Sequence, residues 1–280
     1  MAKQLDAATR DALVERVRFY RDLGLTEFYR RPVDAATLAA GADETQSVAV
    51  GTEVQPAPSQ SHVFEEEPAI SARKSIAAPP EVASAVPAAN RVAALQMIRD
   101  EIGDCTRCAL HKGRNKIVFA DGDPNARLMF VGEGPGADED AQGLPFVGRA
   151  GQLLNNMIAA MGLKREQVYI ANVVKCRPPG NRTPEPDEAN TCTPFLFRQI
   201  DVVRPQVLVA LGATAATYLL GHRQPLAGLR GRVHAFRGTQ LIVTYHPAFL
   251  LRDPRQKKEA WADLQIAMKE LGLKKTATGS

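Results

Sequence analysis

The stretch Arg127–Gly136, which reads RLMFVGEGPG, decides the fold class. Its first half is a short apolar run of the kind that forms a buried strand, and the glycines that follow are typical of a tight turn from strand to helix. Three further apolar runs occur at 168–174 (VYIANVV), 207–211 (VLVAL) and 241–245 (LIVTY), and segments with a helical pattern lie between them. Strands that alternate with helices predict an α/β fold, a three-layer sandwich with a mostly parallel four-stranded central sheet.

The predicted α/β domain spans residues 91–275 and contains five helices: Arg91–Ile102, Gly151–Met161, Asp187–Val203, Ala213–Leu220 and Glu259–Leu271. Residues 1–90 form a separate N-terminal extension that is predicted to be largely disordered. Within it, residues 1–40 contain a short amphipathic helix, which either docks on the chain's own domain or binds an unidentified protein partner. Residues 41–90 are rich in Pro, Ala, Ser and Glu, too poor in apolar side chains to offset the entropy of ordering, and are predicted to be a flexible linker.

Composition excludes several classes of protein. A chain of 280 residues with 45% hydrophobic and 24% charged content can bury a substantial core. No run of 18 apolar residues is present, and the first residues lack a secretory signal pattern, so we expect a cytoplasmic protein without a membrane span. Residues 1–90 carry a net charge of −4 and residues 91–280 a net charge of +8. The basic half is compatible with a polyanionic partner.

The glycine-rich turn Gly132–Gly136 disfavours a nucleotide cofactor. A dinucleotide-binding turn has the pattern GxGxxG, whereas here the third glycine comes one residue early and Glu133 lies inside the turn. Carboxylates follow at once and no lysine is present, so a phosphate would meet repulsion. An ordinary strand-to-helix turn is the alternative interpretation.

Polar residues stand at the ends of two other predicted strands. Asn172 ends the second strand and His246 follows the last one. Because the carboxyl ends of parallel strands meet at one edge of the sheet, we expect Glu133, Asn172 and His246 to line one crevice there.

The four cysteines have metal-ligand spacing. Cys105 and Cys108 form a CxxC pair, and Cys176 and Cys192 are separated by fifteen residues. Thiols in a reducing compartment favour a metal site over disulfides. From spacing alone, zinc, an iron–sulfur cluster and the absence of any metal remain open.

Taken together, these motifs resemble the family 4 uracil-DNA glycosylases, the iron–sulfur type of bacteria and archaea. The resemblance is carried by GEGPG at 132–136, LPFVGRAGQLL at 144–154, NVVKCRPPGNRTP at 172–184 and TYHPAFLLR at 244–252, in the family's order. It implies a uracil-DNA glycosylase-like fold and a DNA repair enzyme that flips uracil out of single- or double-stranded DNA, releases it as the free base and leaves an abasic site. It further implies a [4Fe–4S] cluster on the four cysteines, and we expect a cytoplasmic, nucleoid-associated monomer.

Carried over residue by residue, the resemblance implies the following roles. Uracil is bound by Glu133, Gly134, Pro135, Phe146, Asn172 and His246. Phe146 stacks on the flipped base, and Asn172 pairs with its N3 and O4. His246 donates to O2 of the departing uracil, and Glu133 positions water. Thymine is excluded by a side chain that crowds C5, with Glu139 a candidate. Gly134 stands where related branches place a water-activating Asp or Asn, which leaves the activating group open.

Residues after the His-Pro turn are the predicted DNA contact. Leu250 and Leu251 are expected to wedge into the vacated base stack, and Arg252 to bind phosphates together with Arg255, Lys257 and Lys258. The loop after the second strand contains no His, which argues against a related branch that cross-links itself to DNA.

Two other functions compete with this interpretation. A non-catalytic iron–sulfur DNA-binding protein of the same fold would keep the cysteines and lose the polar groups of the crevice. A zinc-containing nucleotide-binding domain is disfavoured by the acidic turn.

Overall fold

The computed structural model describes residues 76–77, 79–81 and 86–273. The predicted N-terminal helix and most of the predicted linker lie outside these residues. Among the described residues no helix combines the length and the apolar character needed to cross a membrane.

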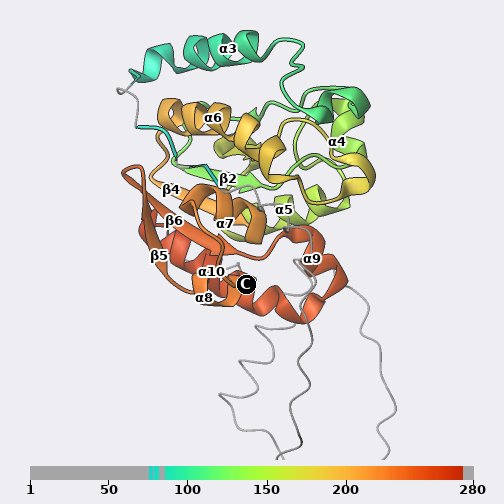
Figure 1. Cartoon of the computed structure of the whole chain (residues 1–280). Coiled ribbons are helices and arrows are strands. Elements are labelled where there is room, and N and C mark those ends of the chain that lie inside the picture. The colour runs from blue at the N-terminus through green and yellow to red at the C-terminus, as the bar shows by residue number, and fades with distance from the viewer. Residues whose placement is uncertain (1–75, 78, 82–85, 274–280) are drawn as a thin grey trace, which may run out of the picture. The chain divides into compact units, whose positions relative to one another are not determined.

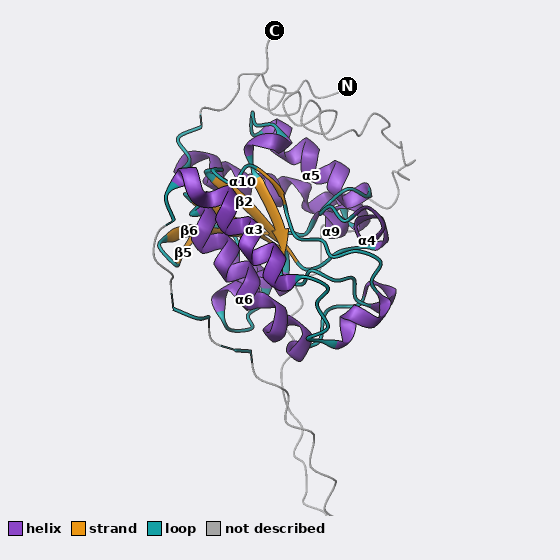
Figure 2. Ribbon diagram, turned by 90° about the horizontal axis from the view of Figure 1, so that it is seen from above, coloured by secondary structure: helices purple, strands orange, loops and turns teal. Residues whose placement is uncertain are grey.

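A six-stranded sheet forms the middle of the domain (Figures 1 and 2). Its order is β1-β3-β2-β4-β6-β5. The bounds are β1 Asp121–Gly122, β2 Leu128–Gly132, β3 Tyr169–Asn172, β4 Val207–Leu211, β5 Val233–Phe236 and β6 Thr239–Thr244. The four inner strands are parallel, as predicted, and the edge strands β1 and β5 are antiparallel to their neighbours. The α/β class is confirmed, and the sheet has two more strands than predicted.

Both faces of the sheet are buried at its centre, where strands β2 and β4 consist of apolar residues and glycine that are buried at every position. In β2, Met129 and Val131 face one hydrophobic cluster, and Leu128 and Phe130 face the other. The first cluster is closed by α3 (Arg91–Ile102), α6 (Pro186–Val203), α7 (Ala213–Leu220) and α8 (Leu226–Leu229). The second is closed by α5 (Arg149–Ala160), α9 (Pro247–Arg252) and α10 (Lys257–Glu270). Alternate side chains of one strand therefore hold the two helical layers on opposite faces.

The sequence pattern missed the short elements. These are β1, β5, α8, α9 and α4 (Ala137–Gln142), together with 3₁₀ turns at Ala88–Asn90, Ala109–Gly113, Arg165–Gln167, Pro179–Asn181 and Pro254–Gln256. Strand β5 gives a weak signal because three of its four residues are not buried. The others are too short for a helical or strand period to repeat.

The end of the predicted linker lies on the domain. Ile76 and Val86 pack against the cluster beneath α6, and the Ala77 amide donates to Asn190 Oδ1 at 3.1 Å. Arg237, at the tip of the β5–β6 hairpin, donates to the carbonyls of Pro80 and Glu81. Several described residues before the predicted boundary at residue 90 therefore contact the domain.

Arg237 also forms a buried ion pair with Asp201 on α6, and both side chains are 5% exposed. We predict that Arg237→Met lowers the free energy of unfolding by about 3 kcal/mol, because it leaves Asp201 buried without the guanidinium. The matched control is Arg198→Met, which breaks a half-exposed pair between α6 and Glu101 and should cost about 1 kcal/mol or less. Urea denaturation of both variants measures the two free energies of unfolding. Equal decreases in the two variants would contradict the burial of the Arg237–Asp201 pair.

Candidate active site

A cleft of about 440 Å³ opens at the carboxyl ends of the parallel strands. Its walls come from the turn after β2, the N-terminal end of α5, the end of β3 with the loop that follows it, and α9 after β6. The residues that line it are Glu133, Gly134, Pro135, Gly136, Glu139, Phe146, Ala150, Asn172, Pro178, Asn181, Arg182, Thr183, His246, Ala248 and Arg252. The structure thus brings together all six residues that the sequence analysis assigned to uracil.

Asn172 is positioned by its strand partner. It lies opposite Gly132 in the β2–β3 ladder and is 1% exposed. A Cβ atom on Gly132 would lie 2.4 Å from Asn172 Oδ1 and 2.5 Å from Cζ of Phe146, so only glycine leaves room for both side chains. Asn172 Oδ1 is buried and has no hydrogen-bond partner within the described part of the chain. A buried acceptor in this state is costly unless a ligand supplies the donor.

Phe146 is held in a backbone conformation that its residue type rarely adopts, with φ of 52°. Arg165 stabilises it by donating to the carbonyls of Phe146 at 3.2 Å and Pro145 at 2.6 Å. The same guanidinium pairs with Asp121 at 2.8 Å. Helix α5 approaches the Phe146 carbonyl so closely that a Cβ on Gly151 would lie 1.9 Å from the oxygen. The sequence analysis missed Arg165 because it acts through backbone carbonyls, which leave no motif.

Glu139 connects the glycine-rich turn to the Phe146 loop. One carboxylate oxygen accepts from the amides of Val147 at 2.9 Å and Gly148 at 3.0 Å, and the other accepts from Gly136 at 3.0 Å. A carboxylate with three backbone donors is fixed in place. Its fixed position on the cleft wall is compatible with the predicted role against C5, which remains a prediction.

His246 is the N-cap of α9, where its Nδ1 accepts from the Ala248 amide at 3.1 Å. The proton of the neutral ring is therefore on Nε2. Burial, with a smaller contribution from the nearby Arg252, lowers the pKa of His246 to about 4, against the opposing effect of Glu139. At neutral pH the ring is an uncharged donor. Its centroid lies 5.5 Å from that of Phe146, with the planes tilted by 33°.

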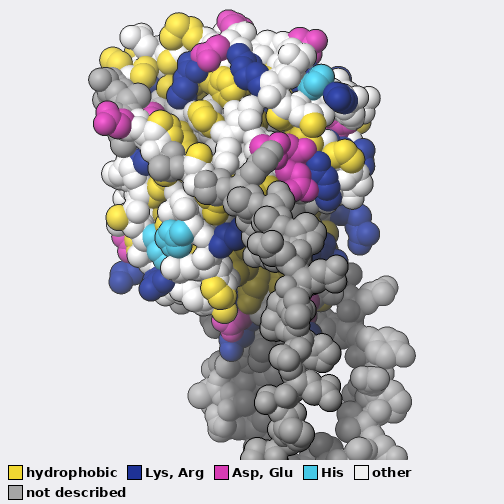
Figure 3. Space-filling view, in the orientation of Figure 1, with side chains coloured by type: hydrophobic (Ala, Val, Ile, Leu, Met, Phe, Trp, Pro, Cys, Tyr) yellow, Lys and Arg dark blue, Asp and Glu magenta, His cyan; other side chains and the backbone are white. Residues whose placement is uncertain are grey.

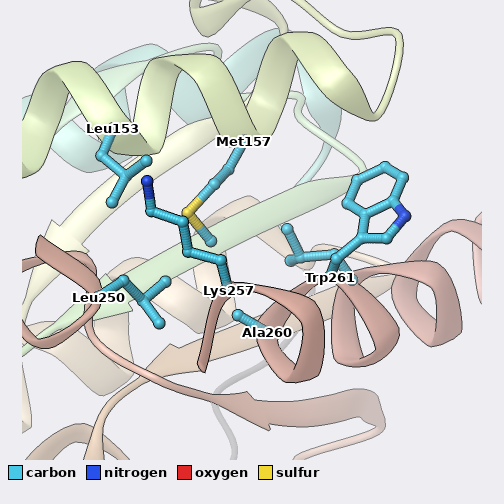
Figure 4. Close-up of a pocket in the computed structure, with 7 residues that line it drawn as sticks. Leu153, Met157, Leu250, Lys257, Ala260 and Trp261 are labelled. Carbon is cyan, nitrogen blue, oxygen red and sulfur yellow. The ribbon is translucent and has the colours of Figure 1, made fainter. Parts of the chain in front are cut away.

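The predicted DNA contact divides into exposed and buried residues. Arg252 lines the cleft, and Leu251 is exposed beside it. Leu250 is 1% exposed and packs in the core between α5 and α10, so its predicted role as a wedge does not fit the structure. Lys257 is also buried, and its stem lies among Leu153, Met157, Leu250, Ala260 and Trp261 (Figure 4). Burial lowers the pKa of its amine. It is corrected from a phosphate contact to a packed side chain.

The four cysteines line a second cavity, on the α6 face of the sheet, with Arg114 and Lys175 among its other walls. Burial raises the pKa of the Cys192 thiol to about 12 and also raises those of Cys108 and Cys176. Within the described residues no three His, Cys, Asp or Glu side chains are close enough to hold a single metal ion. Four soft thiol donors around one cavity suit a larger inorganic group, whose metal atoms spread the ligands apart.

Nitrogen donors point at three of these four sulfurs. Arg107 donates to Cys105 Sγ at 3.3 Å, Arg114 to Cys176 Sγ at 3.5 Å, and the Lys175 amide to Cys192 Sγ at 3.3 Å. Such donors stabilise sulfur that carries negative charge, which is the state of a metal-bound thiolate. The donor set and its surroundings therefore fit a thiolate-ligated group.

Basic side chains are not gathered in one patch on the face shown in Figure 3, where Lys and Arg side chains lie among acidic and apolar ones. The expectation of a polyanionic partner therefore rests on the groups beside the cleft and not on this face as a whole.

The lowered pKa of His246 has a consequence for stability. As the pH falls below about 6.5 the unfolded chain binds a proton at His246, whereas the folded chain binds it only near pH 4. We therefore predict that the His246 contribution to folding is complete above pH 6.5 and is lost as the pH falls to 4. His246→Asn keeps an N-cap acceptor but does not titrate, so its unfolding free energy should fall less steeply over this interval. Identical slopes for the two proteins in urea titrations would contradict the assignment.

Comparison with known proteins gives a consistent result. A family model described as the uracil DNA glycosylase superfamily matches residues 119–265. The type-4 uracil-DNA glycosylase of Thermotoga maritima is 45% identical over 161 residues, which are 57% of this chain and 84% of the relative. That of Pyrobaculum aerophilum is 44% identical over 180 residues, 61% of this chain and 92% of the relative. A type-5 uracil-DNA glycosylase of the same organism is 33% identical over 144 residues, 45% of this chain and 63% of the relative. On this similarity, the chain belongs to the type-4 branch of the uracil-DNA glycosylase superfamily.

Proposed function

We propose that this protein hydrolyses the N-glycosidic bond between uracil and deoxyribose in DNA, releasing uracil and leaving an abasic site. One observation carries the proposal: Asn172 Oδ1 is a buried acceptor without a partner in the described part of the chain, and it lines the same cleft as the neutral His246. The first group is free to accept a hydrogen bond from a base in the cleft, and the second can donate one from its Nε2. Uracil presents both a donor at N3 and an acceptor at O2.

Base selection follows from the direction of these groups. Asn172 Oδ1 accepts from uracil N3–H, whereas cytosine has an acceptor at N3 and would leave two acceptors facing each other. Gly132 leaves the space in which the Asn172 side chain and the Phe146 ring lie, and this selection requires Oδ1 to face the base. Thymine differs from uracil by one methyl group, which only a steric contact can exclude. We assign that contact to Glu139, because three backbone amides prevent its carboxylate from moving aside.

The uracil must leave the base stack before it can enter the cleft. Phe146 offers its ring as the stacking partner inside. Leu251, exposed on α9, is the remaining candidate to fill the vacated stack. Arg252, the next residue, lines the cleft and is the candidate for phosphate binding.

Bond cleavage moves the electron pair of the C1′–N1 bond onto the uracil ring and leaves positive charge on the sugar. His246 Nε2–H donates to O2 and stabilises the departing anion, as donors to an oxyanion do. Water adds to C1′, and the Glu133 carboxylate is the candidate to orient it, accept its proton and stabilise the cationic sugar. The turn that contains Gly134 and Pro135 completes the wall around the base. Of these two residues only Gly134 has a backbone N–H that can donate a hydrogen bond.

We further propose that Cys105, Cys108, Cys176 and Cys192 hold a [4Fe–4S] cluster. When bound, such a group supplies four iron–thiolate bonds that cross-link the segment before β1, the loop after β3 and helix α6. The Lys175 amide, Arg107 and Arg114 donate to its sulfur ligands. The uracil cleft is lined by none of these cysteines, and the proposed chemistry requires none of them.

The decisive experiment incubates the full chain with an oligonucleotide that contains one uracil, followed by alkaline cleavage at abasic sites. We expect strand scission at the uracil position in single- and double-stranded substrates, and no scission when thymine or cytosine replaces uracil. His246→Ala should lower kcat by about 100-fold or more while DNA affinity changes much less, since its donor acts on the departing anion. An uncut strand with iron-loaded protein would leave the non-catalytic DNA-binding function. Equal losses in turnover and affinity would mean that His246 only binds.

The cluster is tested independently of activity. Anaerobically purified protein should be brown, with broad visible absorbance and about four iron atoms per chain. Cys192→Ser should lose absorbance and iron together, because it removes one of the four ligands. A colourless protein that contains zinc would contradict the iron–sulfur assignment and leave the four-thiol site.

A further inference from the structure

Lys175 is a fully buried cation that the proposed chemistry does not use. Lys175 is 1% exposed and lies three residues after Asn172, in the loop that follows β3. A buried ammonium is retained only where its charge and its hydrogen bonds are compensated. Its contacts therefore indicate what it does.

The Lys175 ammonium donates to two buried acceptors. It binds the backbone carbonyl of Asn172 at 2.9 Å and Gln199 Oε1 at 2.6 Å. Gln199 is itself fully buried, and its amide nitrogen contacts the Phe119 carbonyl and Tyr169 Oη, each at 3.3 Å. The Lys175 ammonium thus joins helix α6 to the end of strand β3 through two hydrogen bonds. One of them is made to Asn172, the residue that lines the cleft.

The backbone of Lys175 belongs to the cysteine cavity. Its amide donates to Cys192 Sγ at 3.3 Å, its neighbour is Cys176, and the residue lines that cavity with all four cysteines. Helix α6 accepts a hydrogen bond from the Lys175 backbone through Cys192 and one from its side chain through Gln199. These two residues are seven positions apart and therefore lie on one face of the helix. One residue, Lys175, joins the thiol cavity to Asn172 through hydrogen bonds at both its backbone and its side chain.

We propose that Lys175 is a positioning residue that fixes the base-reading Asn172 to the cysteine cavity and helix α6. This rests on the proposed function, since it assigns to Asn172 the recognition of uracil. The ammonium holds the Asn172 carbonyl in place, and with it the strand end from which the Asn172 side chain reaches the cleft. It also places positive charge next to thiolates that bear negative charge when a metal group is bound. The residue that recognises the base is thereby held against the segment and the helix that carry Cys176 and Cys192.

The test compares Lys175→Met with Lys257→Met in the full chain. Lys257 is a matched control because it is the other buried lysine of the described residues, and it packs between α5 and α10 away from both the cleft and the cysteines. Four quantities are measured: visible absorbance with iron content, thermal stability, kcat/KM on uracil-containing DNA, and the inhibition constant of free uracil.

We expect Lys175→Met to retain visible absorbance, because all four ligands remain, and to lower kcat/KM and weaken inhibition by uracil by about tenfold or more. Lys257→Met should leave both kinetic quantities near those of the wild type, whatever its effect on stability. Unchanged uracil inhibition in Lys175→Met, or equal kinetic losses in the two variants, would overturn the proposal.

A second variant decides the case in which Lys175→Met fails to fold or to retain iron. Gln199→Met removes one acceptor of the ammonium and leaves Lys175 and the cysteines intact. It should weaken uracil inhibition in the same direction while the absorbance stays that of the wild type, and unchanged inhibition would overturn the proposal. A wild-type protein that uracil binds but that cannot release the base from DNA contradicts the proposed function alone. An active wild type with an unaffected Lys175→Met contradicts the positioning role alone.

Discussion

The cleft depends on the missing side chain at Gly132. At the point where β2 and β3 end side by side, any Cβ on Gly132 would overlap both the Asn172 amide and the Phe146 ring. The hydrogen-bonded ladder of a parallel sheet fixes the separation of the two strands, so the space for these side chains cannot come from moving the backbone. Glycine at this position leaves enough space for the Asn172 amide and the Phe146 ring to lie side by side in the buried end of the cleft.

Charged side chains that bind backbone atoms hold the rest of the cleft in place. Glu139 uses both carboxylate oxygens on backbone amides, and Arg165 uses its guanidinium on two carbonyls and on Asp121. These interactions join distant parts of the β2–β3 connection to one another and to β1, and they restrain Phe146 in its positive-φ conformation. Charged groups that bind backbone atoms in this way fix loop geometry better than apolar contacts, because hydrogen bonds are directional. Preorganisation of this kind is what recognition of a small flat base requires.

The sequence predicted the inner part of the fold well because the signals there repeat. Strands β2 and β4 are continuous apolar runs, and α3 and α7 were predicted at their observed bounds. The edge strands and the turn-length helices were missed, since a period cannot be detected in four residues. The placement of Glu133, Asn172 and His246 at one edge followed from the rule for parallel sheets. The error at Leu250 has a simple cause: in helix α9 neighbouring residues are rotated by about 100°, so Leu251 faces out where Leu250 faces in. Lys175 was quoted within a motif, but its burial could not be read from residue type, because lysine is usually exposed.

The order of the thiols along the chain constrains biosynthesis. Cys105 and Cys108 precede every strand of the sheet, Cys176 follows β3, and Cys192 lies within α6. During translation the fourth ligand leaves the ribosome only after two parallel strands have been made, while β4 and β6 are still to come. For the proposed cluster, all four ligands are thus synthesised before β4 and β6, and the first two thiols precede the other two by most of the β2–β3 half of the sheet.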